Sequence, residues 1–265
     1  MKALINGFEM EYRIEGKVGS PWVTFSHSLA CNMTMWGGQV DILERNYRIL
    51  RYDTRGHGGS EAVPGPYNFR MLAADVIALW NSLNISKSHF IGLSLGGMTG
   101  LGLGLDHEDR IMSLCICNAR ADSSEGGQQA WAERVSAARE QGMDAIVDSS
   151  ISRWFTRRGI EANLPVIDKA RAMIRSTSIE GYSGGAAAIQ QLDYLPRLGR
   201  ISRPTFFIVG SEDPGTPPEA ARAMQREARG TTLLEIEGAA HLSNLERPDV
   251  FNPAMADFLS SNANS

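Results

Sequence analysis

The chain has 265 residues, of which 43% are hydrophobic and 21% charged, and its net charge is −4, so it suits one large soluble α/β domain with an insertion. No basic cluster stands out, which argues against a nucleic-acid partner. No run approaches the roughly 20 apolar residues of a membrane span, and Met1–Glu15 lacks the apolar core of a signal peptide, so we expect a cytoplasmic protein with no membrane partner.

Strands and helices alternate through the first 121 residues. Alternating apolar and polar residues predict a first strand at Phe8–Ile14. Apolar runs and helical spacing then predict strands at 22–25, 47–52, 88–91 and 111–117, and helices at 35–45, 71–83 and 98–105. Such alternation favours a mostly parallel central sheet with helices on both faces.

The alternation pauses between about residues 122 and 195, where the chain reads as helices with no strong strand. It resumes after Pro196 with a strand at 205–209, a helix at 219–229, a strand at 231–236 and a last helix at 249–259. We therefore predict an α/β core formed by residues 1–121 and 196–265, with a helical cap inserted at 122–195.

A glycine-rich turn carries the strongest chemical signal. The sequence Gly92-Leu93-Ser94-Leu95-Gly96-Gly97 follows the strand at 88–91 and opens the next helix. Glycines two residues before and after a serine allow a sharp strand-to-helix turn that presents the hydroxyl clear of the sheet. This context predicts that Ser94 is a nucleophile.

A serine nucleophile needs a base, and five histidines compete for that role. His241 follows the last strand, where a loop at the carboxyl edge of the sheet reaches back toward the turn at Ser94, and it completes the chain order serine, acid, histidine. His27 and His57 lie in loops after early strands, while His89 and His107 suit surface or packing roles. His241 is therefore the predicted base.

The acid should lie between Ser94 and His241, on a loop that follows a strand. Asp213 comes directly after the strand at 205–209 and is our candidate for orienting the imidazole. Its neighbour Glu212 and the earlier Asp122 are rivals, and capping of the helix at 219–229 is an alternative role for Asp213.

Hydrolysis also needs donors for the developing oxyanion. We expect one to be the backbone N–H of Leu95, which follows the nucleophile at a helix N-terminus. The second is expected from the loop after the strand at 22–25, at the backbone N–H of Leu29.

Three other patterns argue against further chemistry. The string Asp53-Thr54-Arg55-Gly56-His57-Gly58-Gly59-Ser60 looks catalytic, but its glycines suit a tight loop braced by side-chain hydrogen bonds. The run Gly100-Leu101-Gly102-Leu103-Gly104 lacks the third glycine of a dinucleotide site. The three cysteines match neither a disulfide framework nor metal-ligand spacing, so we expect reduced thiols and no metal.

Several motifs together resemble the α/β-hydrolase fold, and within it the 3-oxoadipate enol-lactonases. The most diagnostic are Arg51-Tyr52-Asp53-Thr54-Arg55-Gly56-His57-Gly58 and His241-Leu242-Ser243-Asn244-Leu245-Glu246. The turn at Ser94 also matches, but many hydrolases share it. The resemblance spans nearly the whole chain and maps Ser94, Asp213 and His241 onto the family's triad. The chain departs from it at His27-Ser28-Leu29-Ala30, where the family often has Asn-Ser-Leu-Gly.

The resemblance implies hydrolysis of a small carboxylated lactone without a cofactor. A carboxylate needs a cation, and Arg134 and Arg153 are candidates, with a solvated helix face as the alternative for each. Trp154 either lines the pocket or anchors the cap. A carboxylesterase, a carbon–carbon bond hydrolase on the same triad, and a ligand sensor with little turnover remain alternative functions.

Overall fold

The computed structural model describes residues 1–123 and 127–263. Eight strands form one sheet in the order β1-β2-β4-β3-β5-β6-β7-β8. β1 and β2 are antiparallel to their neighbours, and the strands from β4 to β8 run parallel. The strands are β1 (Lys2–Ile5), β2 (Phe8–Gly16), β3 (Trp22–Ser26), β4 (Arg48–Tyr52), β5 (Ser88–Leu93), β6 (Ile111–Cys117), β7 (Thr205–Gly210) and β8 (Thr232–Ile236).

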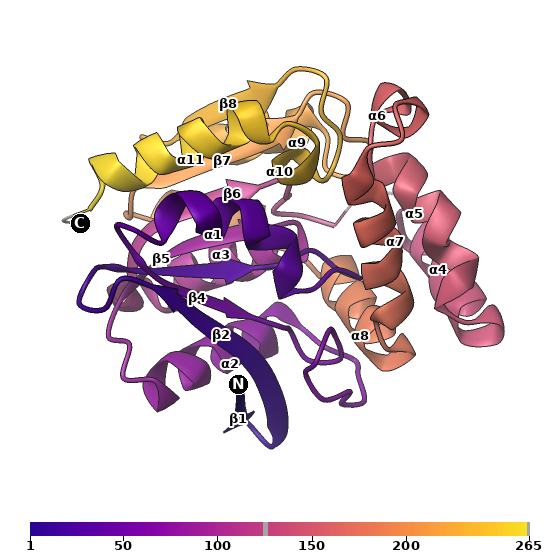
Figure 1. Cartoon of the computed structure of the whole chain (residues 1–265), viewed down its shortest axis with the longest axis horizontal. Coiled ribbons are helices and arrows are strands. Elements are labelled where there is room, and N and C mark those ends of the chain that lie inside the picture. Colours follow the sequence, from indigo (N-terminus) through magenta and orange to yellow (C-terminus); the bar gives the residue numbers. More distant parts are fainter. Residues whose placement is uncertain (124–126, 264–265) are drawn as a thin grey trace.

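Helices cover both faces of the sheet, which confirms the predicted fold class (Figure 1). On one face α1 (Gly37–Leu43) packs against α11 (Pro248–Ser261), and on the other α2 (Phe69–Ser82) packs against α3 (Leu95–Asp106). The short α10 (Ser243–Glu246) precedes α11, and α9 (Pro218–Glu227) packs on β7 and β8. The inner strands β5 and β7 are buried along their whole length, as expected when both faces are covered.

The structure differs from the predicted elements at two places near the N-terminus. The edge strand β1 was not predicted, because only Ile5 of its four residues is buried and its apolar pattern is weak. The helix predicted at 35–45 is divided into a 3₁₀ turn at Met33–Trp36 and α1. Asn32 caps that turn by accepting a hydrogen bond from the backbone N–H of Thr34.

In the described part of the chain, five α-helices lie between β6 and β7 in sequence. They lie together beside the carboxyl edge of the sheet (Figure 1). They are α4 (Gly127–Gln141), α5 (Val147–Trp154), α6 (Arg157–Glu161), α7 (Pro165–Ser176) and α8 (Ile179–Gln190). The two ends of this segment meet, since Asp122 and Asp193 form an antiparallel bridge and Tyr194 N–H donates to Ala121 C=O at 2.6 Å. In the described part of the chain, every helix is too short or too polar to span a membrane.

Candidate active site

Ser94 stands at a tight turn between β5 and α3, in a backbone conformation that L residues rarely adopt (φ 56°, ψ −114°). Glycine is required on both sides because the backbone folds back on itself. A Cβ on Gly92 would lie 2.2 Å from the carbonyl oxygen of Gly96, and one on Gly96 would lie 2.3 Å from that of Ser26. The predicted turn therefore exists, and only 5% of Ser94 is exposed.

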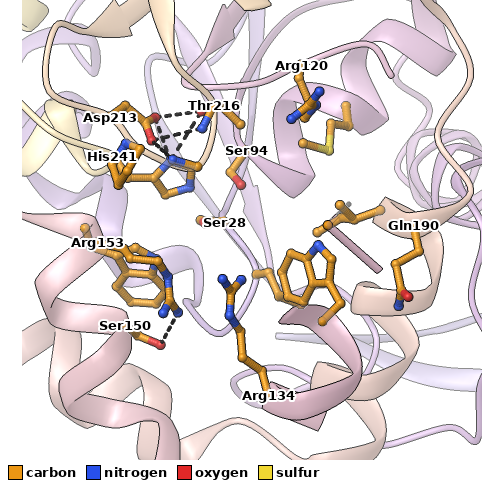
Figure 2. Close-up of a pocket in the computed structure, with 18 of the residues that line it drawn as sticks. Ser28, Ser94, Arg120, Arg134, Ser150, Arg153, Gln190, Asp213, Thr216 and His241 are labelled. Atoms are coloured by element: carbon orange, nitrogen blue, oxygen red, sulfur yellow. Dashed lines mark hydrogen bonds and ion pairs between the residues drawn. The ribbon is translucent and has the colours of Figure 1, made fainter. Parts of the chain in front are cut away.

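The loops after β7 and β8 bring Asp213 and His241 together. His241 Nδ1 donates to Asp213 Oδ2 at 2.8 Å, and Figure 2 shows both residues beside Ser94. With Nδ1 donating to the carboxylate, Nε2 is left with its lone pair, the form that accepts a proton from a nucleophile. Within residues 1–123 and 127–263, no hydrogen bond yet joins the Ser94 hydroxyl to His241, and such contacts often tighten only when substrate binds.

Asp213 is held by an unusually complete set of donors. Its Oδ1 accepts from the backbone N–H groups of Gly215 and Thr216, and its Oδ2 accepts from the Thr216 hydroxyl at 2.6 Å and the Asn118 amide at 2.9 Å. Burial acts to raise the pKa of the Asp213 carboxyl, but His241, Thr216 and Asn118 outweigh it and hold that pKa below its usual value. Asp213 is thus ionised at neutral pH.

The rival acids lie apart from His241. Glu212 is exposed, and Asp122 forms an ion pair with Arg120 at 3.1 Å. The other loop histidines are buried away from the cavity: burial lowers the pKa of His27 to about 4, and burial together with His27 lowers that of His57 to about 3. His241 is the histidine that lines the cavity with Ser94.

The loop at 27–30 packs directly against the start of α3. The backbone carbonyl of His27 accepts from Gly96 N–H at 3.1 Å, which holds this loop beside Leu95. In the described part of the chain, the backbone N–H groups of Leu29 and Leu95 donate to no protein acceptor. The assignment of these two groups as the oxyanion donors stays a prediction.

A cavity of about 150 Å³ opens beside Ser94, between the carboxyl edge of the sheet and helices α4, α5 and α8. All three residues predicted to bind substrate line it: Arg134 from α4, and Arg153 and Trp154 from α5. Figure 2 shows the two arginines. Trp154 also anchors the segment, because its backbone C=O accepts from Leu242 N–H at 3.0 Å. Both arginines line the cavity, and their role in binding a substrate stays a prediction.

The two arginines make the cavity strongly cationic. Arg134 lies 5.0 Å from the ring centre of Trp131, and Arg153 donates to the Ser150 hydroxyl at 3.2 Å. Burial, and then the charge of Arg134, lowers the pKa of Arg153 to about 10, so Arg153 remains charged at neutral pH. Among the described residues, neither has a carboxylate within ion-pair distance.

Sequence reasoning missed three residues that contact or line this site: Asn118, Thr216 and Arg120. Asn118 follows β6 and is fully buried; besides Asp213, its amide donates to Ala240 C=O at 3.1 Å, and its Oδ1 accepts from Ser243. Asn118 and Arg120 follow a strand at the carboxyl edge, which was the available signal. Only the assembled loops reveal which groups they contact.

The ending His-x-Ser-Asn-x-Glu is explained by its contacts. Glu246 accepts from the backbone N–H of Ala240 at 2.8 Å and from the N–H and hydroxyl of Thr156, which begins α6. Asn244 and Gln39 exchange hydrogen bonds near α1. These contacts fix the loop that carries His241 to α1 on one side and to the helical segment on the other.

The string at 53–60 is a braced loop that lies outside the cavity, as predicted. Asp53 accepts from the backbone N–H groups of Met33 and Gly59, and Arg55 pairs with Asp75 at 2.7 Å. Among the described residues, no three His, Cys, Asp or Glu side chains gather as a metal site.

A strained serine at a strand–helix turn, facing a histidine–aspartate pair from later strands, is the arrangement of hydrolases built on a parallel sheet. Comparison with known proteins agrees: residues 21–248 match the model of the alpha/beta hydrolase fold, and the chain belongs to this family.

The similar proteins within this family include enol-lactonases and an esterase. The chain is 36% identical to 3-oxoadipate enol-lactonase 2 of Acinetobacter baylyi, over 93% of this chain and 91% of that protein. It resembles the crystal structure of the enol-lactonase from Burkholderia xenovorans with a TM-score of 0.94 and 38% identity, covering 98% of this chain and all of that one. A thermophilic esterase from Thermogutta terrifontis, solved with malate bound, has a TM-score of 0.93 and 26% identity, covering 100% of this chain and 99% of that one. The predicted resemblance is confirmed.

Proposed function

We propose that this chain is a serine hydrolase that opens a small lactone bearing a carboxylate, of the 3-oxoadipate enol-lactone type. The observation that carries the proposal is one cavity in which Ser94 and the His241–Asp213 pair face two arginines that lack acidic partners among the described residues. The names of the relatives support the same substrate class.

In this proposal the Ser94 hydroxyl attacks the lactone carbonyl carbon while His241 Nε2 takes its proton. The backbone N–H groups of Leu29 and Leu95 stabilise the oxyanion, and Asp213 stabilises the imidazolium. Collapse of the intermediate breaks the ring C–O bond, and His241 returns the proton to the leaving oxygen. The leaving group stays tethered to the acyl-enzyme.

Water, activated by His241, then attacks the acyl carbon and restores Ser94, so one ring-opened acid leaves. No step needs a cofactor. Arg134 and Arg153 are proposed to hold the carboxylate that the substrate already carries, and Trp154 to line its ring. Their place on α4 and α5 gives the helical segment at 122–195 the role of a cap over the core at 1–121 and 196–265.

The test compares kcat/KM for 3-oxoadipate enol-lactone with that for phenyl acetate, a neutral ester. We expect the lactone to be preferred by at least about a hundredfold, because each charge-assisted contact contributes roughly 1.5–3 kcal/mol. A preference for the neutral ester overturns the lactone assignment. Ser94→Ala should lower kcat at least about 10⁴-fold for both substrates, and full activity in that variant overturns the mechanism.

A further inference from the structure

A third arginine lines the cavity, and the proposed mechanism does not use it. Arg120 follows β6 by three residues and has 15% of its side chain exposed. Figure 2 shows it on the opposite side of Ser94 from Arg134 and Arg153. The cavity therefore has cationic groups on two sides of the nucleophile.

The contacts of Arg120 leave one edge of its guanidinium open. Its Nε donates to the backbone C=O of Asp122 at 2.6 Å, and its Nε and Nη2 both contact Asp122 Oδ1, at 3.2 and 3.1 Å. A guanidinium has a second fork, formed by Nη1 and Nη2, that matches a carboxylate equally well. Asp122 thus occupies one fork and fixes the orientation of the group, while no residue in the described part of the chain hydrogen-bonds to the other fork.

The rest of the cavity wall favours an anion at this position. Of the described residues that line the cavity, Asp213 is the only acid, and its oxygens are already satisfied by Asn118, Thr216, Gly215 and His241. An anion at Arg120 therefore meets no uncompensated negative charge from the described lining residues. Asp122, which pairs with the same guanidinium, is not one of these lining residues.

We propose that Arg120 is a second anion subsite, and that the site binds a dicarboxylate with one carboxylate at Arg134 and Arg153 and the other at Arg120. The inference rests on the proposed function and extends it to the product. Hydrolysis of a carboxylated lactone converts its acyl carbon at Ser94 into a new carboxylate, so the ring-opened product is a dianion. Arg120 receives the new carboxylate as it leaves Ser94.

The test measures binding alone, in the Ser94→Ala protein, by calorimetry with adipate and hexanoate at fixed pH and ionic strength. These probes share a six-carbon chain and differ by one carboxylate. We expect adipate to bind about tenfold more tightly, which is the gain of one charge-assisted pair at a partly exposed site. Equal affinities overturn the proposal. Because no turnover is needed, failure here is distinct from failure of the hydrolysis test.

Variants of Arg120 test whether this residue causes the difference in affinity between adipate and hexanoate. Adding Arg120→Met should reduce the adipate-to-hexanoate ratio to within about twofold, whereas Arg153→Met should weaken both probes and keep the ratio. Arg197→Met removes an arginine–aspartate pair outside the cavity and should leave the ratio unchanged. If Arg120→Met does not fold, Arg120→Lys provides the test. An ammonium cannot bind two carboxylates in the bidentate way that a guanidinium can, so the adipate-to-hexanoate ratio should fall at least threefold. A ratio that persists in either folded variant overturns the subsite.

Discussion

The cavity has two walls that are held in different ways. On the sheet side, Asp213 accepts hydrogen bonds from Gly215, Thr216, Asn118 and His241, all between 2.6 and 3.0 Å. On the helical side, Arg153 makes one side-chain hydrogen bond at 3.2 Å, and Arg134 rests on an indole ring. The groups proposed for chemistry are fixed, and those proposed for recognition keep free donors.

This difference follows from what each wall must do. A catalytic group gains rate by being held in the reactive geometry before the substrate arrives. A recognition group must leave donors open, since a guanidinium with every edge occupied by carboxylates has little to gain from a substrate. Changes to Asp213 or to the groups that hold it should therefore lower kcat, and changes to Arg134 or Arg153 should raise KM.

The largest expected effect is on the sheet side. Asp213→Asn should lower kcat about 10⁴-fold, because the amide cannot hold the Nδ1–H tautomer of His241 or stabilise its charged form. The matched control is Asp122→Asn, which alters the carboxylate after the neighbouring strand that pairs with Arg120. The kcat of Asp122→Asn should change less than about tenfold. An equal loss of kcat in both variants would mean that Asp213 is not the acid that orients His241.

The sheet side should also be sensitive to acid. The pKa of His27 is lowered to about 4 and that of His57 to about 3 in the folded chain, against 6.5 when unfolded. The unfolded state therefore binds more protons, so this stability is fully present above pH 6.5 and is lost as the pH falls toward 4. A charged His27 could not accept from Thr54 N–H, as it does at 2.9 Å.

Urea unfolding between pH 7 and 4.5 measures this loss. Each histidine should contribute a slope of about 1 kcal/mol of unfolding free energy per pH unit below 6.5. His57→Gln should reduce the total slope by one such contribution. A free energy of unfolding that stays constant over this range would mean that these imidazoles are not held neutral.

A smaller loss of kcat is expected from Asn118, which binds Asp213 and the loop that carries His241. Asn118 has a positive φ of 43°, so glycine removes its amide without straining the backbone. Asn118→Gly should lower kcat by about 10- to 100-fold with KM within about twofold, the effect of losing an orienting partner. Asn163→Gly, at an exposed residue with φ 51°, is the matched control and should leave kcat unchanged. A rise in KM alone would place Asn118 outside the positioning of the pair.

The sequence predicted those features of the site that depend on neighbouring residues or on the order of the strands along the chain. The glycines around Ser94 predicted the turn, and the place of His241 after the last strand predicted that this histidine is the base. Asp213 was chosen over Asp122 because it follows the strand at 205–209 directly, and the structure places Asp213 against the imidazole. The edge strand β1 was not predicted, because one buried residue in four gives no clear alternation of apolar and polar residues.

Contacts between distant loops could not be predicted in the same way. Asn118 contacts groups 95 and 122 residues further along the chain, so its role depends on three strand ends meeting at one edge. The direction in which Arg120 points is set by Asp122, and nothing in their spacing separates a surface ion pair from a cavity wall. Helical spacing likewise left open whether Arg134 and Arg153 face solvent or substrate.

The smallest expected effect is a rise in KM when an arginine on the helical side is changed. Arg153→Met keeps most of the side-chain volume and removes the charge, so it should raise KM for a carboxylated lactone about tenfold and change kcat less than threefold. Arg157→Met is the matched control: that residue lies on the next helix with 92% of its side chain exposed, and an exposed ion pair contributes little. KM for phenyl acetate should change less than twofold in both variants, since a neutral ester has no carboxylate for Arg153 to hold. If Arg153→Met instead lowered kcat as strongly as Asn118→Gly, the two walls would not divide chemistry from recognition, and the arginine would act on the transition state itself.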